Sequence, residues 1–270
     1  MDFFEERGTG YVFKARERAA LYVKRSMPHS TIKAEPICLE KIMEYDFKVY
    51  PKELGEKDYW GQVKRTVNGK PVSEEQIQLI LDAVCANLEL RLGGEDRLLD
   101  LGCGNGALSQ LLFDRVSAFL GVDYSEYLIL VAKRDFERLP DFRFEVADVL
   151  GYVVGERAPE RFNKVLCYGC FSYFPLAEEL LAKLHQRFTH VTHVFLGNLP
   201  DRARMDQFYR GALPDAEELV NHDSKIGIWR TAEELIALAE RAGWKTKITH
   251  MPTTFYASHY RYDVTLVRAI

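Results

Sequence analysis

Glycines and a carboxylate stand at a spacing that suits the binding of a nucleotide-like ligand. Residues 98–112, LLDLGCGNGALSQLL, are typical of a short apolar strand, a glycine-rich turn and a helix. Gly102, Gly104 and Ala107 fit the pattern G-x-G-x-x-G/A, in which glycines permit a sharp turn and a close ligand approach. Asp100 stands two residues before the first glycine. A carboxylate at a buried strand end needs a partner, and either a cationic ligand group or backbone amides would supply one.

This motif resembles the first motif of the class I S-adenosylmethionine-dependent methyltransferases, an acidic residue followed by a glycine-rich loop, here LDLGCGNG. The resemblance extends over about residues 75–270. It implies S-adenosylmethionine as cofactor and S-adenosylhomocysteine as product. It also implies a role for Asp123, 23 positions after Asp100, because one carboxylate can accept hydrogen bonds from both ribose hydroxyls. The alternative for Asp123 is a plain residue before a helix.

The resemblance assigns further cofactor contacts to residues near the ends of other strands. Tyr124 would lie against the adenine, and Asp148 would accept from the adenine amino group. Trp60, Gln62 and Arg65, in a segment before the core, would cover the methionine carboxylate, which an arginine fork can bind bidentately. The implied cofactor-binding set is Asp100, Gly102, Cys103, Gly104, Asp123, Tyr124, Asp148, Val149, Tyr168, Trp60 and Arg65.

Plainer readings exist for several of these residues. Asp148 could cap the short helix that follows it, and Tyr124 could be a core aromatic residue. Cys103 is expected to fill the loop without reacting, because its neighbours include no basic group that would lower its pKa.

Catalytic candidates follow from the place where a methyl acceptor would bind. His222 lies in the segment 201–229, where members of the family have a substrate-covering lid, and histidine titrates near working pH. It is therefore the first candidate base. Tyr168 and Tyr173 follow the fourth strand and are expected to face the crevice, where either could react or shape the pocket. The protein's main task would be to align nucleophile, methyl and sulfur.

Alternating strands and helices must position these residues. Strands are predicted at 97–101, 118–123, 142–147, 163–168 and 191–197, and helices at 73–90, 106–113, 125–138, 175–188 and 231–242. Such alternation indicates right-handed βαβ units and a parallel sheet. The segments 245–251 and 260–268 read as strands with no helix between them, so they should pair antiparallel.

The predicted fold is therefore α/β, with a Rossmann-like, doubly wound and mainly parallel seven-stranded sheet that closes with a C-terminal antiparallel hairpin. Residues 1–72 are predicted to form an N-terminal leader or cap, and residues 73–270 the methyltransferase core with a lid at 201–229. Within the core, Ser73, Ser125 and Thr231 are predicted helix caps, and Pro175 is expected in the first turn of its helix.

The composition limits the classes of partner that the protein is expected to bind. The 270 residues include 36 Lys and Arg against 40 Asp and Glu, and a net charge of −4 argues against a nucleic-acid partner. Only Cys167 and Cys170 form a CxxC pair, and no second pair would complete a zinc site, so no metal is expected. The N-terminus lacks the apolar stretch of a signal peptide, and no apolar run reaches the ~18 residues of a membrane span, so a cytoplasmic location without a membrane partner is expected.

The predicted function is methyl transfer from S-adenosylmethionine to an oxygen or nitrogen of a small-molecule acceptor. Three alternatives stay open. The first is a non-catalytic S-adenosylmethionine-binding or regulatory protein. The second is a nucleic-acid methyltransferase, although CYGCFSYFP replaces the Asn/Asp-Pro-Pro-aromatic motif. The third is an NAD-dependent dehydrogenase, against which Asp100 and the closing hairpin argue. Substrate and oligomeric state are left open.

Overall fold

The computed structural model describes residues 45–209, 211 and 213–268. The chain divides into two units, Met1–Cys38 and Leu39–Ile270, and all described residues belong to the second. The predicted boundary between residues 72 and 73 stays a prediction.

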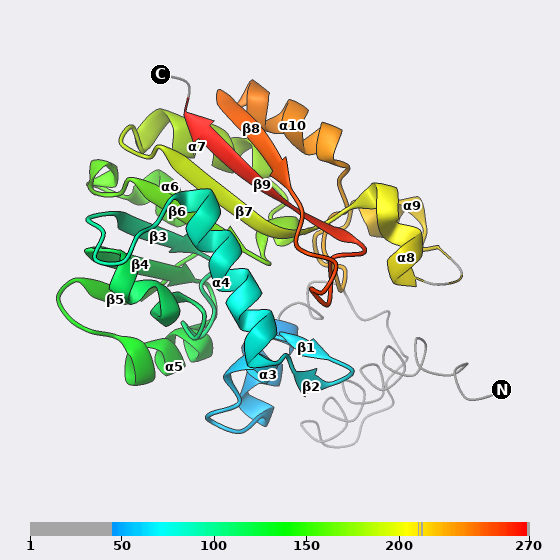
Figure 1. Ribbon diagram of the computed structural model, residues 1–270, viewed down its shortest axis with the longest axis horizontal. Helices are drawn as coiled ribbons and strands as arrows, with labels where there is room; N and C mark the ends of the chain where they lie inside the picture. The colour runs from blue at the N-terminus through cyan, green and yellow to red at the C-terminus, as the bar shows by residue number, and fades with distance from the viewer. Residues whose placement is uncertain (1–44, 210, 212, 269–270) are drawn as a thin grey trace, which may run out of the picture. The chain divides into compact units, whose positions relative to one another are not determined.

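Seven strands of the second unit form one sheet in the order β5-β4-β3-β6-β7-β9-β8 (Figure 1). The strands are β3 (Arg97–Leu101), β4 (Ala118–Asp123), β5 (Phe142–Val146), β6 (Lys164–Tyr168), β7 (His193–Pro200), β8 (Trp244–Thr249) and β9 (Arg261–Arg268). The first five run parallel, and β9 pairs antiparallel with both β7 and β8. The predicted doubly wound sheet with its antiparallel end is confirmed.

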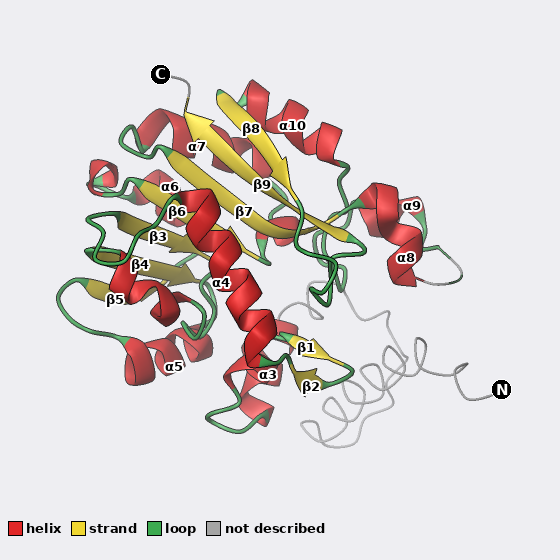
Figure 2. Ribbon diagram, viewed as in Figure 1, coloured by secondary structure: helices red, strands yellow, loops and turns green. Residues whose placement is uncertain are grey.

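Helices cover both faces of this sheet, which explains its continuous apolar strands (Figure 2). All five residues of β6 are buried, as expected for a parallel strand between two helical layers. On one face, the core combines the strands with α6 (Val149–Gly155), α7 (Ala177–Arg187) and α10 (Ala232–Arg241). On the other face, it combines them with α4 (Glu74–Leu88), η3 (Ser109–Arg115) and α5 (Glu126–Phe136).

The helix ends confirm some of the predicted caps and correct others. Ser125 accepts from the Leu128 amide, and Thr231 forms a complete capping box with Glu234. Ser73 occupies the cap position of α4, but its side chain makes no capping bond.

Two predicted helix starts are wrong. The helix expected from residue 106 begins only at Ser109 and is a 3₁₀ helix, because Gly106 has a left-handed φ of +76° that no right-handed helix accepts. Pro175 lies outside its helix, since α7 begins at Ala177 after its cap Leu176.

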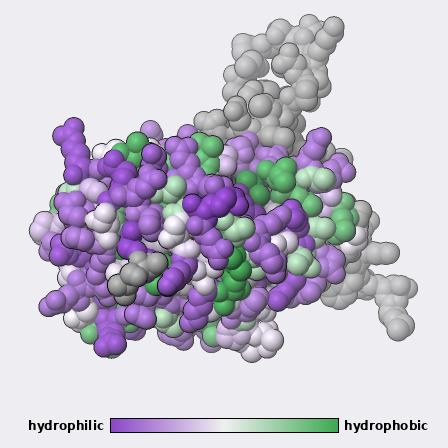
Figure 3. Space-filling model, turned by 90° about the horizontal axis from the view of Figure 1, so that it is seen from above, coloured by the Kyte–Doolittle hydropathy of each residue, from purple (hydrophilic) through white to green (hydrophobic). Residues whose placement is uncertain are grey.

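The segments predicted to form a leader (1–72) and a lid (201–229) contain short elements where the structure describes them. The described leader has η1 (Tyr45–Val49), η2 (Tyr50–Glu53), α3 (Tyr59–Gln62) and a hairpin of β1 (Thr66–Val67) and β2 (Lys70–Pro71). The lid segment has η6 (Arg202–Arg204), α8 (Met205–Tyr209) and α9 (Ala216–Leu219), while η4 (Pro159–Arg161) and η5 (Phe171–Tyr173) flank β6. Over the described residues, every helix is too short or too polar to span a bilayer. The face shown in Figure 3 is mostly hydrophilic, with apolar side chains scattered between polar ones.

Candidate functional site

The glycine-rich loop follows β3, where the strand order changes direction, since β4 lies on one side of β3 and β6 on the other. Ligands of doubly wound sheets bind at such a switch point, beyond the carboxyl ends of the strands. Gly102 and Gly104 have φ values of +78° and +58°. A Cβ atom would lie 2.5 Å from Cys170 Sγ at Gly102 and 2.9 Å from Val63 Cγ1 at Gly104. The loop therefore requires glycine at both positions for conformation and for space.

Asp100 is buried at the end of β3, with 3 % of its surface exposed. Its Oδ2 atom accepts a hydrogen bond of 2.7 Å from Ser109 Oγ. Burial raises the pKa of Asp100 to about 7; the Ser109 bond lowers this pKa, whereas the charge of Asp123 raises it further. A cationic ligand group beside Asp100 would favour its ionised form.

Asp123 ends β4 and supports the glycine loop. Its Oδ2 accepts from the Gly104 amide and its Oδ1 from the Ser125 amide, both at 2.9 Å. Burial raises the pKa of Asp123 to about 6, although both backbone bonds lower it. Because each carboxylate oxygen has a second lone pair, the group still has capacity for two more donors.

The other predicted adenine-side residues have clear positions. Asp148 is exposed and caps α6 by accepting from the Gly151 amide at 2.7 Å, so the capping reading is present in the structure. The side chain of Val149 is buried in the core. Tyr124 is half-buried, with Lys48 Nζ 5.3 Å from its ring centroid. A Cβ on Gly121 would lie 2.8 Å from Cys103 Sγ, and burial raises the pKa of this thiol well above its ordinary value, as expected for an inert cysteine.

The predicted carboxylate-binding pair lies together at the edge of the leader. The Arg65 guanidinium lies 5.5 Å from the ring centroid of Trp60 and 5.4 Å from that of Tyr168. The charge of Arg65 also lowers the pKa of Asp100, which places this cation near the glycine loop. Arg65 forms no ion pair with any residue that the structure describes, so its charge remains available to an anionic ligand group.

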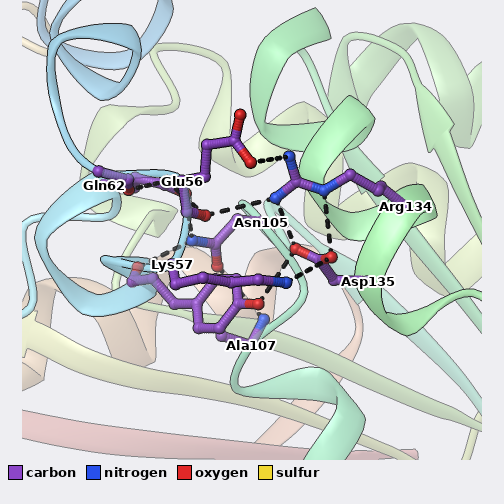
Figure 4. A network of polar contacts seen from close by, with 9 residues as sticks. Glu56, Lys57, Gln62, Asn105, Ala107, Arg134 and Asp135 are labelled. Atoms are coloured by element: carbon purple, nitrogen blue, oxygen red, sulfur yellow. Dashed lines mark hydrogen bonds and ion pairs between the residues drawn. The ribbon is translucent and has the colours of Figure 1, made fainter.

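Gln62, the third residue predicted beside the methionine carboxylate, instead bonds Asn105, and the two form a clamp between leader and loop that the sequence did not reveal (Figure 4). Asn105 Nδ2 donates to Gln62 Oε1 at 2.9 Å and to the Tyr59 carbonyl at 2.8 Å, while its Oδ1 accepts from the Ala107 amide at 3.2 Å. Gln62 Nε2 donates to the carbonyls of Gly55 and Glu56. Gln62 and Asn105 are 0 % and 1 % exposed, so the leader is fastened directly to the loop.

Charged residues extend this connection to α5. Arg134 bonds Glu56 at 3.2 Å, and Lys57 bonds Asp135 at 2.9 Å. Arg134, Lys57 and Tyr59 bond Asp135, and these contacts lower the pKa of Asp135 well below its ordinary value. The leader therefore contacts both the glycine-rich loop after β3 and the helix α5 after β4.

The three catalytic candidates have different surroundings in the structure. Tyr168 is buried at the end of β6, beside Arg65. Tyr173 donates from its hydroxyl to the Lys225 carbonyl at 2.9 Å and so ties η5 to the lid. His222 is 38 % exposed, with its Nε2 atom 3.4 Å from Asp223. Its role as a base stays a prediction. Among the described residues, no group of three or more His, Cys, Asp or Glu side chains is arranged to bind a metal.

Comparisons with known proteins agree with this geometry. Residues 98–190 match the family model described as a methyltransferase domain. The juvenile hormone acid O-methyltransferase of Drosophila melanogaster is 30 % identical over 109 residues, 38 % of this chain and 36 % of that protein. The ubiquinone biosynthesis O-methyltransferase of Pseudomonas syringae pv. tomato is 26 % identical over 175 residues, 61 % of this chain and 72 % of that protein.

The chain thus spans only about a third of the length of the juvenile hormone acid enzyme that it matches. Among solved structures, phosphoethanolamine N-methyltransferase 2 of Haemonchus contortus in complex with S-adenosyl-L-methionine has a TM-score of 0.59 at 13 % identity, covering 88 % of this chain and 62 % of that chain. Magnesium protoporphyrin IX methyltransferase of Synechocystis PCC 6803 with bound S-adenosylmethionine has a TM-score of 0.54 at 16 % identity, covering 88 % and 100 %. At these identities, the structures confirm the fold.

Proposed function

We propose that this chain, whose residues 98–190 match a family model described as a methyltransferase domain, is a class I methyltransferase that transfers a methyl group from S-adenosylmethionine to an oxygen or nitrogen of a small-molecule acceptor. The observation that carries the proposal is the pair of buried carboxylates, Asp100 and Asp123, on neighbouring strand ends around a loop that requires glycine.

The residues present fit the parts of this cofactor. Asp123 has capacity left for two ribose hydroxyls beyond its two amide bonds. Arg65, stacked between Trp60 and Tyr168, suits the methionine carboxylate. Asp100, a buried carboxylate at the end of β3, suits the cationic side of the methionine part, because a neighbouring cation would favour its ionised form. Tyr124, Asp148, Val149 and the backbone of Cys103 would contact the remaining adenosine atoms.

The chemistry of the reaction requires the site to position the acceptor atom more than to activate the methyl group. The bound cofactor supplies a methyl group that is already activated on a sulfonium. Alignment of the acceptor atom with that methyl is worth up to ~7–11 kcal/mol in model systems. The clamp between Gln62 and Asn105 fastens the leader over the loop, which supports a fixed and water-poor geometry.

A small-molecule acceptor is favoured by the names of the relatives. They act, by name, on juvenile hormone acid and in ubiquinone biosynthesis. The net charge of −4 agrees with such acceptors better than with a nucleic acid. A cytoplasmic location stays a prediction.

Isothermal calorimetry with S-adenosylmethionine, S-adenosylhomocysteine and NADH tests the proposal. We expect micromolar binding of both sulfur ligands, none of NADH, and at least about tenfold weaker binding after Asp123→Ala, because charged hydrogen bonds contribute ~1.5–3 kcal/mol each. Asp82→Ala, on the exposed side of α4, is the matched control. Folded protein that binds neither sulfur ligand would refute the proposal, and NADH binding would favour the dehydrogenase.

A further inference from the structure

Beside the cofactor residues, a second group of buried polar atoms lies at the same edge of the sheet. Tyr168 Oη, Asn198 Oδ1 and Asp263 Oδ2 are buried, and none of the three has a hydrogen-bond partner among the described residues. Tyr168 is 5 % exposed and Asp263 is 1 % exposed. Since an unsatisfied buried polar group costs ~1–3 kcal/mol, three on adjacent strands indicate a place where a ligand completes the hydrogen bonds.

An irregularity in β7 creates this arrangement. The pairing of β7 with β9 shifts between Leu196 and Leu199, and Asn198 has a φ of +63°. The Asn198 amide donates to Asp263 Oδ1 at 2.6 Å. One carboxylate oxygen of Asp263 is therefore fixed by the bulge, and the other is left over.

Gly197 brings Tyr168 toward the same carboxylate. Gly197 is the register partner of Tyr168, and a Cβ there would lie 2.3 Å from Tyr168 Cδ2. The tyrosine ring therefore lies across β7, which separates β6 from β9 in the sheet. Burial raises the pKa of Tyr168 well above its ordinary value, and the charge of Asp263 raises it further, yet the two side chains form no hydrogen bond with each other. Tyr168 Oη and Asp263 Oδ2 are therefore both left for a polar atom of a ligand.

Burial makes Asp263 more basic than an ordinary carboxylate, although charged and polar groups face it. Arg261 faces it from its own strand, Tyr168 from β6, and Arg65 and Tyr256 lie near Tyr168. The helix α4, which covers this face, contributes a buried apolar row to the core. Burial raises the pKa of Asp263 to about 6, although the Asn198 amide and Arg261 lower it. At pH 7 the group is mostly ionised but more basic than an ordinary carboxylate, which suits proton transfer.

Aromatic side chains pack around Tyr260, three residues before Asp263 in the chain. Tyr260 precedes β9 and packs against Phe208 of the lid at 4.8 Å and against Trp229 at 6.1 Å between ring centroids. The Arg261 guanidinium lies 4.9 Å from the Tyr260 ring centroid. Flat apolar faces of this kind favour an acceptor with an aromatic body.

We propose that Asp263 is the general base for methylation of a phenolic hydroxyl, with Tyr168 hydrogen-bonded to the same oxygen. This inference rests on the proposed function. The phenol gives its proton to Asp263 Oδ2. Its oxygen forms a bond to the methyl carbon as the carbon–sulfur bond breaks, and that electron pair stays on sulfur, giving the thioether product and the aryl methyl ether. Asp263 thereby fills the role for which the sequence indicated His222.

The test measures methyl transfer from radiolabelled S-adenosylmethionine to a panel of phenols and catechols, with aliphatic carboxylic acids and primary amines for comparison. We expect the phenols to be methylated. Asp263→Asn should lower kcat on them by ~10²–10⁴-fold, the usual contribution of a general base. The amide retains an oxygen for the Asn198 N–H, so folding and the affinity for S-adenosylhomocysteine should persist. Asp82→Asn, exposed on α4, is the matched control.

Two readouts separate a base from a structural residue. With S-adenosylmethionine saturating, so that Asp100 and Asp123 are held ionised by the bound cofactor, kcat/KM for the phenol in the wild type should fall as pH drops through about 6, and Asp263→Asn should abolish this limb. A nitrophenol that is already ionised at the assay pH should lose less than about tenfold in the variant, since it has no proton to give. Equal losses on ionised and un-ionised phenols would overturn the proposal.

Other outcomes are equally decisive. If Asp263→Asn does not fold, Tyr168→Phe, which removes one unpartnered oxygen, should still lower kcat/KM on phenols at unchanged S-adenosylhomocysteine affinity. Unchanged kcat/KM in Tyr168→Phe would overturn the assignment. Turnover of carboxylates or amines but no phenol, or cofactor binding without any phenol turnover, would overturn this inference and leave the proposed function standing. Failure to bind S-adenosylhomocysteine would instead refute the proposed function.

Discussion

Replacing Asn105 by aspartate should release the leader from the glycine loop. Asn105 donates two hydrogen bonds, to the Tyr59 carbonyl at 2.8 Å and to Gln62 Oε1 at 2.9 Å, from a position that is 1 % exposed. Asn105→Asp has nearly the same shape but no donor, so a carboxylate oxygen would face two acceptors. Gln62 cannot reorient freely, because its Nε2 already donates to two carbonyls.

The size of the effect follows from these bonds. Each lost bond costs ~1 kcal/mol net, and leaving a buried acceptor unsatisfied adds ~1–3 kcal/mol, so we expect about 3 kcal/mol of destabilisation in total. For a unit of this length, that is a fall in Tm of about 6–12 °C. The loss should be smaller at low pH, where a protonated carboxyl group regains one donor.

Thermal unfolding and calorimetry with S-adenosylhomocysteine measure the two consequences, stability and cofactor affinity. Asn68→Asp is the matched control, since Asn68 is exposed in the turn between β1 and β2 and has a φ of +51°, which aspartate tolerates. If Asn105→Asp lowers Tm by no more than the control, and the affinity is unchanged, the clamp does not hold the loop and this reasoning is wrong.

Three further predictions concern the cofactor site. The pKa values of Asp100 and Asp123 are raised to about 7 and about 6, so the folded apoprotein keeps protons that the unfolded chain releases near pH 4. The unfolding free energy should therefore fall as pH rises from about 4 to about 7. Urea denaturation at several pH values checks this, and a rise over that window would contradict it. Gly104→Ala should lower the unfolding free energy by at least ~1–2 kcal/mol because of the φ of +58°, and further because a Cβ would lie 2.9 Å from Val63. In denaturation curves, adding Val63→Ala should recover only the loss caused by the contact with Val63. Full recovery of stability would show that the left-handed backbone at residue 104 does not require glycine. Arg65→Lys should weaken S-adenosylmethionine binding by about tenfold, because one ammonium replaces a bidentate fork. The affinity for methylthioadenosine, which lacks the carboxylate, should stay the same in calorimetry. Equal losses of affinity for both ligands would point to a structural role of Arg65.

The fold was predictable because its pattern is local. The run at 118–123 is apolar and ends in an acidic residue, and β4 has those bounds. The terminal strands were recognisable because no helical segment separates them. The glycine loop, Asp100 and Asp123 were recognisable because all lie within 24 residues of the sequence.

The parts that escaped prediction depend on contacts between distant residues. Asn105 and Gln62 are 43 positions apart, and nothing in the loop motif indicates that Asn105 is buried. The delayed start of η3 reflects the backbone of Gly106. Asp263 lies in a predicted strand, but its position depends on a bulge 65 residues earlier, at Asn198. The only local signal was a single acidic residue within the strand, whose sequence is RYDVTLVR.

The position of β9 affects how the chain reaches its final form during synthesis. β9 lies between β7 and β8, although both precede it in the sequence. While the chain emerges from the ribosome, the inner edge of β7 stays unpaired until residue 268 has been made, and an unpaired edge strand invites pairing with other chains. The strand that carries Asp263 is also the one that covers this edge. Completion of the sheet and arrival of the proposed base are therefore a single event, so partial chains that end before β9 would be both inactive and prone to aggregate.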